Sequence, residues 1–394
     1  MLRAARPLLG AALATIVAAA ALTAPAEPAE PASTGASVSG TGTGPAARAA
    51  ELVSTMTTAQ QAAAVIMGHI PTTDPSALSA YMTQGYGGFI LMGANIPSDE
   101  EELHAVTGAL VVDAALPPLI AIDQEGGLVS RLDTDGFPAS TSLKSQPVSD
   151  TASAFSGRGA LVAQAGATVN FGTVADVTAD PSSFIYGRAL GTDPQAAADR
   201  VAAATTAQER VLASTLKHFP GHGAAPGDSH HAIPSTTESL DRWRAADAVP
   251  FVAGIDAGAS LLMFGHLAYT AVDSAPASLS ARWHEIARDE LGFDGVMVTD
   301  DLGMLQASGI EEYRDPVANA VAAIAAGNDL VLMISGSTAG TAAQMAAGLV
   351  AAVESGSLPA ERLADAATRV LTLRLEQSAS PAHWSRCPEC EPAG

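Results

Sequence analysis

The sequence predicts a single (β/α)8 barrel of the TIM type. From residue 46 to about 375, short apolar runs alternate with longer amphipathic segments rich in alanine, as expected of repeated βα units around a parallel sheet. Eight such runs can be distinguished, and eight is the number of strands in this barrel. Polar residues directly follow several of the runs, which indicates a site at the carboxyl ends of the strands.

Each expected strand is a short apolar run between polar or turn-forming residues. The eight runs cover residues 64–67, 88–92, 119–122, 169–177, 212–218, 260–265, 295–299 and 330–334.

Three of the intervening helices carry recognisable end signals. Ser98 and Glu101 match a capping box, which predicts that a helix begins there. A second helix is expected over 316–326, because Gly327 is suited to ending it. The last helix, over 359–375, would complete the outer ring.

The composition excludes two classes of protein. The chain has 394 residues with 41 acidic and 19 basic side chains, a net charge of -22. A surface this acidic repels phosphate, so binding to nucleic acid through bulk electrostatics is excluded. Because 48% of the residues are hydrophobic and only 15% are charged, the chain can bury a core and is not disordered throughout.

The first 45 residues have the composition of an export signal and a linker. Arg3 and Arg6 precede an unbroken small and apolar run over 7–22, which predicts a signal peptide over 1–24. The run is shorter than the ~20 apolar residues that a bilayer span needs, which favours a cleaved signal peptide. The alternative is that the segment is retained as an amino-terminal membrane anchor. Residues 25–45 are rich in Pro, Ala and Gly and read as a disordered linker. We therefore expect an exported protein.

Both cysteines lie in a polar segment at the carboxyl end, residues 376–394, which we expect to be a flexible tail. Cys387 and Cys390 form a single CxxC pair. In an exported chain this pair is suited to a small disulfide, with metal binding or redox work as alternatives. One CxxC pair alone favours a structural role.

Polar residues at the ends of five expected strands would meet at one mouth of the barrel. For a single member such as Asp176 or His266, a helix cap or a solvated loop explains the residue equally well. Together they favour an active site. The residues are Asp123, Asp176, Lys217, His218, His266, Asp300 and Asp301.

Four of the nine histidines fall within residues 218–231, a cluster that suggests metal ligation or proton transfer. His218 and His222 have the spacing of a helical zinc pair, but Pro220 and neighbouring glycines interrupt a helix there. No thiolate or HExxH set completes a zinc site, so zinc remains the weaker interpretation.

Proton transfer explains more of this cluster. Asp228 and His230 are two residues apart on a Gly- and Pro-rich loop, so the carboxylate can orient the imidazole and raise its basicity. Lys217 is one of only two lysines, which suggests a specific need for a compact ammonium charge.

The segment 217–223, followed by Asp228, Ser229 and His230, resembles the signature loop of glycoside hydrolase family 3 β-N-acetylglucosaminidases, the β-hexosaminidase subgroup. The resemblance extends over most of residues 50–375, which implies that 46–375 is the catalytic domain. Three further motifs carry it: Asp123-Gln124-Glu125-Gly126-Gly127 with Val129 and Arg131, the segment 170–177, and the segment 291–304.

The resemblance implies a retaining mechanism. It assigns Asp300 as the nucleophile. A carboxylate placed below the anomeric carbon can form the covalent glycosyl intermediate that this mechanism requires. Asp301 is interpreted as a structural partner of the loop. His230, oriented by Asp228, is the expected general acid/base in place of a second carboxylate.

The same residue-by-residue match implies a sugar-binding set. We expect Asp123 to accept hydroxyl protons, and Lys217 and His218 to donate to ring hydroxyls. Two departures stand out: Arg188 precedes Ala and Leu where the family has Ser and Phe, and Leu128 replaces a usual Arg. The set comprises Asp123, Arg131, Arg188, Lys217 and His218.

The expected function is therefore an exported β-N-acetylhexosaminidase that removes terminal β-linked N-acetylglucosamine from chitin-type or peptidoglycan-derived oligosaccharides. The alternatives are a β-glucosidase, an N-acetylglucosaminide phosphorylase or a non-catalytic surface glycan-binding protein. A β-glucosidase of this family takes its acid from an additional carboxyl-terminal domain, which we do not expect here. We expect a monomer that acts on an oligosaccharide substrate and can associate with the cell wall. We expect it to bind no nucleic acid, metal or organic cofactor.

Overall fold

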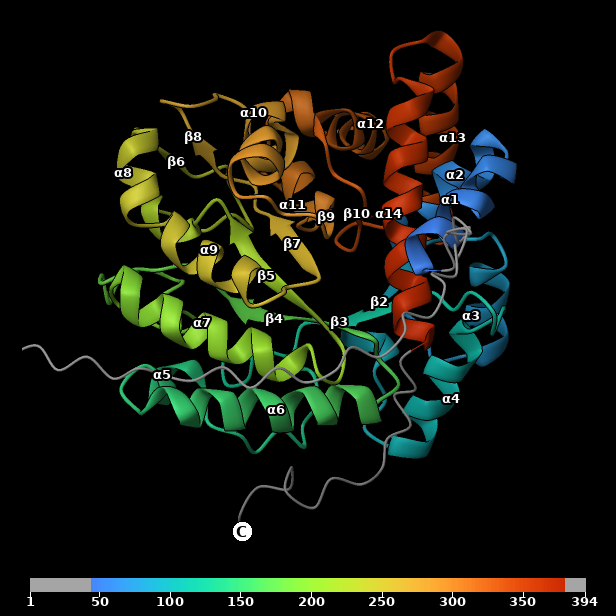
Figure 1. Ribbon diagram of the computed structural model, residues 1–394. Coiled ribbons are helices and arrows are strands. Elements are labelled where there is room, and N and C mark those ends of the chain that lie inside the picture. Colours follow the sequence, from blue (N-terminus) through green and yellow to red (C-terminus); the bar gives the residue numbers. More distant parts are fainter. Residues whose placement is uncertain (1–43, 380–394) are drawn as a thin grey trace, which may run out of the picture. The chain divides into compact units, whose positions relative to one another are not determined.

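Eight parallel strands form the barrel that the sequence predicts (Figure 1). The structure, a computed structural model, describes residues 44–379. Seven neighbouring pairs are hydrogen-bonded ladders in the order β10-β1-β2-β3-β4-β5-β7-β9. A bridge between Val298 and Leu330 joins β9 to the start of β10 and completes the ring. The strands are β1 (Ile66–Gly68), β2 (Gly88–Leu91), β3 (Leu119–Ile122), β4 (Val169–Val174), β5 (Ala213–Phe219), β7 (Leu261–Phe264), β9 (Val296–Thr299) and β10 (Val331–Leu332).

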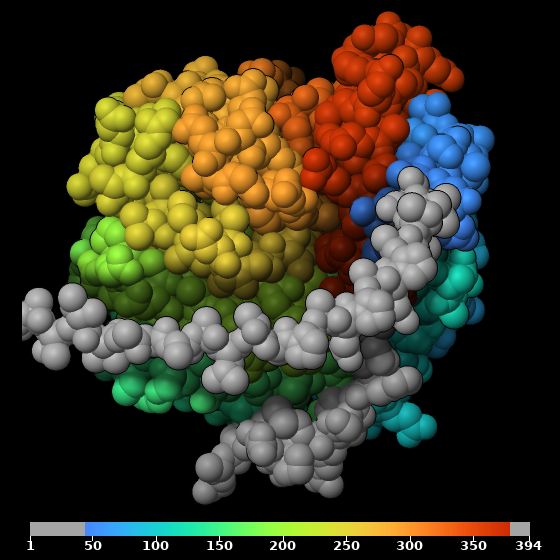
Figure 2. Space-filling model, in the orientation of Figure 1, coloured from blue at the N-terminus to red at the C-terminus, as the bar shows by residue number. Residues whose placement is uncertain are grey.

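Helices surround the strands in chain order. In Figure 2 the colours pass round the molecule from blue through green and yellow to red, and red meets blue where α14 packs on α1. The helices are α1 (Pro45–Thr55), α2 (Thr58–Ala64), α3 (Pro75–Met82), α4 (Glu100–Leu110), α5 (Ser140–Leu143), α6 (Val148–Gln164), α7 (Pro194–Gln208), α8 (Leu240–Ala245), α9 (Ala248–Asp256), α10 (Ala281–Glu285), α11 (Leu302–Ala307), α12 (Pro316–Ala326), α13 (Thr341–Ser355) and α14 (Ala360–Ala379).

Side chains alternate between the barrel interior and the helix layer, as the period of two in a strand requires. In β2, Ile90 belongs to the interior cluster, whereas Phe89 and Leu91 pack with the surrounding helices. In β9, Val296 and Val298 face the interior. The interior is therefore a packed apolar core that supports the mouth from below.

Two of the predicted boundaries that differ from the structure are explained by helix caps. Ala64 does not begin the first strand but ends α2, because Thr57 and Gln60 form a capping box that starts a helix just before it. The cap of α4 is Asp99 and not Ser98, since the Asp99 carboxylate accepts from the backbone N–H of Glu102 at 2.9 Å. A carboxylate at this position also complements the helix dipole.

The predicted end of α12 is confirmed. Asp315 caps its first turn, Pro316 occupies the first position, and Gly327 ends it with a φ of 132°. A side chain on Gly327 would be strained by this backbone angle, and its Cβ would lie 2.6 Å from the Cβ of His284. The final helix, α14, continues to Ala379, past the predicted end at residue 375.

A small second sheet, which the sequence did not predict, lies beside the barrel. Its two parallel strands are β6 (Ser235–Thr236) and β8 (Ala268–Tyr269). The Tyr269 hydroxyl also donates to the backbone carbonyl of Gly221 at 2.8 Å. The segment between β5 and β6, which contains the histidine cluster, is therefore anchored at both ends.

Several predicted features lie outside the described residues, namely the signal peptide over 1–24, most of the linker over 25–45, and Cys387 and Cys390. Within residues 44–379, none of the helices combines the length and apolarity needed to cross a bilayer.

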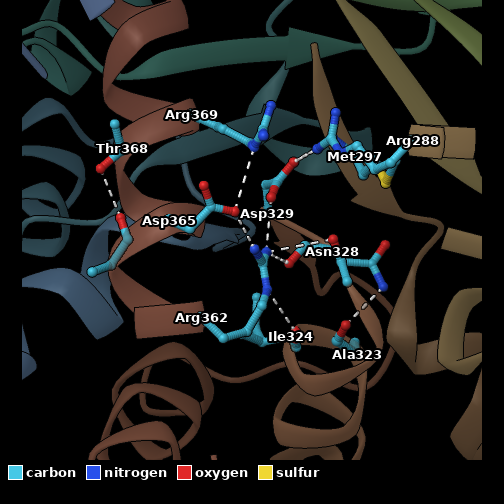
Figure 3. Close-up of polar contacts among 12 residues, drawn as sticks. Arg288, Met297, Ala323, Ile324, Asn328, Asp329, Arg362, Asp365, Thr368 and Arg369 are labelled. Carbon is cyan, nitrogen blue, oxygen red and sulfur yellow. Dashed lines mark hydrogen bonds and ion pairs between the residues drawn. The ribbon is translucent and has the colours of Figure 1, made fainter. Parts of the chain in front are cut away.

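Asp329 joins the start of β10 to β9 and α14 (Figure 3). Its carboxylate is fully buried and accepts from Arg362 Nη2 at 2.8 Å and from the backbone N–H of Met297 at 3.0 Å. Arg288 completes the ion-pair cluster. Because both guanidinium groups approach one buried carboxylate, loss of its charge would leave Arg288 without its carboxylate partner and Arg362 with Asp365 alone.

We expect Asp329→Asn to lower the free energy of unfolding by about 3–5 kcal/mol, because it removes the one buried carboxylate that the partly buried Arg288 and Arg362 share. The matched control is Asp365→Asn, which alters another carboxylate on Arg362 whose side chain is 50% exposed. The control is expected to cost about 0–1 kcal/mol. Urea denaturation of the two variants measures the difference, and equal losses would contradict a special role for Asp329.

Candidate active site

A cavity of about 280 Å³ opens at the carboxyl ends of the barrel strands. Seven of the eight predicted site residues line it, and the remaining one, Asp228, contacts His230 from behind. The structure therefore brings together residues that are up to 177 positions apart in the chain, from 123 to 300. The polar lining residues are Asp123, Glu125, Arg131, Arg188, Lys217, His218, His222, Ser229, His230, Asp300, Asp301 and Ser335.

Lys217 lies at the centre of a buried charge network. Its Nζ atom is 2.7 Å from Asp123 Oδ1 and 2.7 Å from Glu125 Oε1. Arg188 donates to the other side of Glu125 through Nε at 2.9 Å and Nη2 at 2.7 Å, a bidentate pair. These contacts fix the end of β3 against the end of β5 and hold Arg188 over the cavity.

Glu125 is a site residue that was not predicted from the sequence, where it appeared only as part of the motif over 123–127. Burial works to raise the pKa of this carboxyl, but Lys217 and Arg188 outweigh it and lower the pKa to about 2. The signal in the sequence was a second carboxylate two positions after Asp123. Its role depends on a lysine and an arginine from other strands, which spacing alone does not reveal.

Asp176 orients His218. The fully buried carboxylate lies 2.7 Å from His218 Nδ1 and accepts from the backbone N–H of His222 at 2.6 Å. With Nδ1 bonded to Asp176, Nε2 is the remaining ring nitrogen of His218. This atom is 3.3 Å from Arg188 Nη2. The expectation that His218 donates to a ring hydroxyl stays a prediction.

Asp300 follows β9 and faces the cavity. Its Oδ1 atom accepts from the backbone N–H of Asp301 at 2.8 Å. Burial works to raise the pKa of Asp300, but His218, His266 and Lys217 hold it below its usual range. The Asp300 carboxylate is therefore ionised and available at neutral pH.

Asp301 is committed to the backbone around it. Its carboxylate accepts from the N–H groups of Gly303 at 2.9 Å, Ile334 at 2.7 Å and Ser335 at 2.9 Å. This geometry agrees with the interpretation of Asp301 as a structural residue. His266 is likewise structural, since its ring bonds to Ser278 Oγ and the Asp301 carbonyl and does not line the cavity.

Asp228 and His230 form the contact that their spacing predicted. The Nδ1 atom of His230 bonds to Asp228 Oδ1, which also accepts from the backbone N–H of His230 at 3.0 Å. The His230 side chain is 54% exposed and lines the cavity that also contains Asp300. With Nδ1 bonded to Asp228, Nε2 is the remaining ring nitrogen of His230.

The zinc interpretation finds no supporting geometry. The rings of His218 and His222 are 6.0 Å apart and nearly perpendicular, at 85°. In the part of the chain from 44 to 379, no three His, Cys, Asp or Glu side chains are grouped as a metal site would require.

Comparison with known proteins agrees with this geometry. A family model described as the glycosyl hydrolase family 3 N terminal domain matches residues 55–373. A β-hexosaminidase from Pseudomonas aeruginosa is 38% identical over 256 residues, which cover 63% of this chain and 74% of the relative. A β-hexosaminidase from Bordetella avium is 36% identical over 259 residues, which cover 63% of this chain and 73% of the relative.

Solved structures are similar over a longer part of the chain. A glycoside hydrolase family 3 β-N-acetylglucosaminidase from Paenibacillus sp. is similar with a TM-score of 0.76 and 29% identity. The match covers 82% of this chain and 63% of that one, so this chain spans less than two thirds of the Paenibacillus protein. A β-N-acetylhexosaminidase from Beutenbergia cavernae matches with a TM-score of 0.71 and 30% identity, over 81% of this chain and 98% of that one.

Glu125→Gln should remove an acid-sensitive contribution to stability. Because its pKa is about 2 in the folded state and 4.5 ordinarily, the ionised form stabilises the fold above pH 4.5. This contribution, about 3 kcal/mol, is lost as the pH falls through that range toward 2. The difference in unfolding free energy between wild type and Glu125→Gln should therefore shrink from pH 6 to pH 3 in urea titrations.

The exposed Glu361 at the start of α14 provides the control, and Glu361→Gln should change the unfolding free energy by less than about 0.5 kcal/mol. A Glu125→Gln deficit that stays constant with pH would show that Glu125 does not stabilise the fold through its charge.

Proposed function

The chain belongs to glycoside hydrolase family 3, and from this membership we propose that it is an exported, retaining β-N-acetylhexosaminidase. The observation that carries the proposal is the presence of Asp300 and His230 in one cavity. The substrates proposed are oligosaccharides of the chitin or peptidoglycan type with β-linked N-acetylglucosamine at the non-reducing end.

The first step of the proposed reaction breaks the glycosidic bond. Asp300 attacks the anomeric carbon while His230 gives its Nε2 proton to the leaving oxygen, so a glycosyl ester of Asp300 and a free alcohol result. In the second step His230 takes a proton from water, and the resulting hydroxide displaces Asp300. Two inversions at one carbon give net retention.

A histidine suits this work beside an ionised aspartate. Two carboxylates close together repel each other, and one of them must then hold a proton at a raised pKa. A histidine that has given up its proton is a neutral imidazole and not a carboxylate, so it adds no second negative charge beside Asp300. The exposed position of His230 also lets it reach both the leaving group and water.

The charge of the cavity favours a neutral ligand. Lys217 and Arg188 are paired with carboxylates at 2.7 Å, and Arg131 lies 3.9 Å from Asp123. The cavity lining carries four carboxylates against these three cations, so it offers no net positive charge to an anion and supports hydrolysis of a neutral sugar more than phosphorolysis. Leu128, which precedes the lining residue Val129, is 72% exposed.

Wild-type protein is expected to hydrolyse p-nitrophenyl N-acetyl-β-glucosaminide, and to cleave the corresponding β-glucoside much less well. Phosphate should not accelerate turnover, because the cavity lining carries no net positive charge to hold it. Release of p-nitrophenol measures both substrates. Activity confined to the glucoside, or dependent on phosphate, would replace the proposal with the alternative concerned. Activity in the culture medium of expressing cells, and not inside them, checks export.

Variants at the two reacting groups should fail in different ways. Asp300→Ala is expected to abolish turnover, since no covalent intermediate can form. His230→Ala should lower kcat/KM by about 10²–10⁴-fold with a poor leaving group. With a dinitrophenyl leaving group, which needs little protonation, the loss in bond cleavage should be much smaller. Steady-state kinetics on both substrates measures this contrast, and equal losses would argue against an acid role for His230.

A further inference from the structure

His222 is a buried side chain in the cavity wall to which the reaction assigns no task. It is the first residue of a short 3-10 turn, His222–Ala224, directly after β5. Its side chain lines the cavity, yet the residue is only 1% exposed. It lies between Phe184, whose ring centroid is 4.6 Å away, and His218 at 6.0 Å. These rings fix its orientation.

Both ring nitrogens of His222 lack a hydrogen-bond partner among the described residues. The backbone N–H of His222 is occupied, since it donates to Asp176 Oδ1 at 2.6 Å. Buried polar atoms are normally hydrogen-bonded, and leaving them unpaired is unfavourable. In the same cavity wall, Lys217 and Glu125 are fully engaged with one another and their neighbours. The partner available to the ring at its cavity face is therefore a group that enters the cavity, either a ligand or water.

The state of the ring defines the chemistry of that ligand. Burial is the main cause that lowers the pKa of His222 to about 4, so the imidazole is neutral near pH 7. A neutral imidazole offers one N–H donor and one acceptor nitrogen. A hydroxyl group, which both donates and accepts, matches either atom. An anion would match only the N–H, and it would also face the nearby Asp176 and Asp300 carboxylates.

We propose that His222 binds a hydroxyl group of the sugar ring that occupies the cavity, and so helps to select and position the substrate. This inference rests on the proposed glycosidase function and adds a residue to its sugar-binding set. His222 acts on binding and orientation, whereas proton transfer remains with His230. It is therefore a positioning residue.

The test pairs one substitution with a series of substrates. His222→Phe keeps a buried ring against Phe184 but removes both nitrogens. The aryl glycoside that wild type cleaves best is the parent, and analogues deoxygenated at one ring carbon at a time are compared with it. For wild type, the analogue that lacks the bound hydroxyl should lose about 10–100-fold in kcat/KM, whereas His222→Phe should cleave that analogue and the parent equally.

Other deoxy analogues should lose the same factor in both proteins. His222→Gln, whose amide keeps a donor and an acceptor, should recover part of the dependence on that hydroxyl and provides a second variant if the Phe form folds poorly. His284→Phe is the matched control, because His284 is also buried, stacks on Phe264 at 3.9 Å and does not line the cavity. The control should leave the whole deoxy profile unchanged.

The proposal would be overturned if His222→Phe lost the same factor in kcat/KM as wild type on every deoxy analogue, whether or not its overall activity is lower. This failure is distinct from failure of the proposed function. If wild type prefers a glucoside, the deoxy series is built on that glucoside and still tests His222. If wild type cleaves the acetamido substrate, the series tests His222 alone.

Discussion

The mouth of the barrel depends on one buried ammonium group. Lys217 is in contact with Asp123 and Glu125, both at 2.7 Å, and its side chain is only 3% exposed. Removing one partner of such a buried pair typically costs 3–5 kcal/mol, because the other charge stays buried without compensation. The network therefore specifies one arrangement of the ends of β3 and β5. Arg188 reaches the cavity only because Glu125, held by Lys217, receives its guanidinium.

The two proposed reacting groups, Asp300 and His230, lie in parts of the molecule that differ in how firmly they are held and in how exposed they are. Asp300 directly follows β9 and is held by a backbone hydrogen bond at 2.8 Å, so its position is set by the barrel. His230 lies on the segment between β5 and β6 and keeps a 54% exposed side chain. A rigid nucleophile needs no movement to meet the anomeric carbon, whereas an acid that later activates water benefits from access to solvent. The small β6 and β8 sheet limits how far this segment can travel.

Much of the fold could be predicted from the sequence because hydrophobic periodicity reports burial directly. All eight barrel strands were predicted. The contact between Asp228 and His230 was predicted as well, because side chains two residues apart on a tight loop lie close together. Glu125 was not recognised as a site residue, Asp176 was only grouped with the other strand-end residues, and His222 was considered only as half of a zinc pair. The roles of Glu125 and Asp176 arise from partners elsewhere in the chain, and long-range contacts leave no local pattern. The cap at Asp99 was missed because Ser98 and Asp99 are equally good capping residues.

The cavity wall contains two kinds of polar side chain, those that are paired with a partner and those that are not. Lysine and arginine side chains bring charges that must be balanced in the unliganded protein, so their carboxylate partners lie within the wall and hold it together. A neutral imidazole carries no charge to balance, and the protein can bury it at moderate cost with its nitrogens unmatched. Such a group is most useful where a neutral ligand supplies the missing partner. Rigid charge pairs thus shape the cavity, and the uncharged His222 is left as the group able to respond to what enters it.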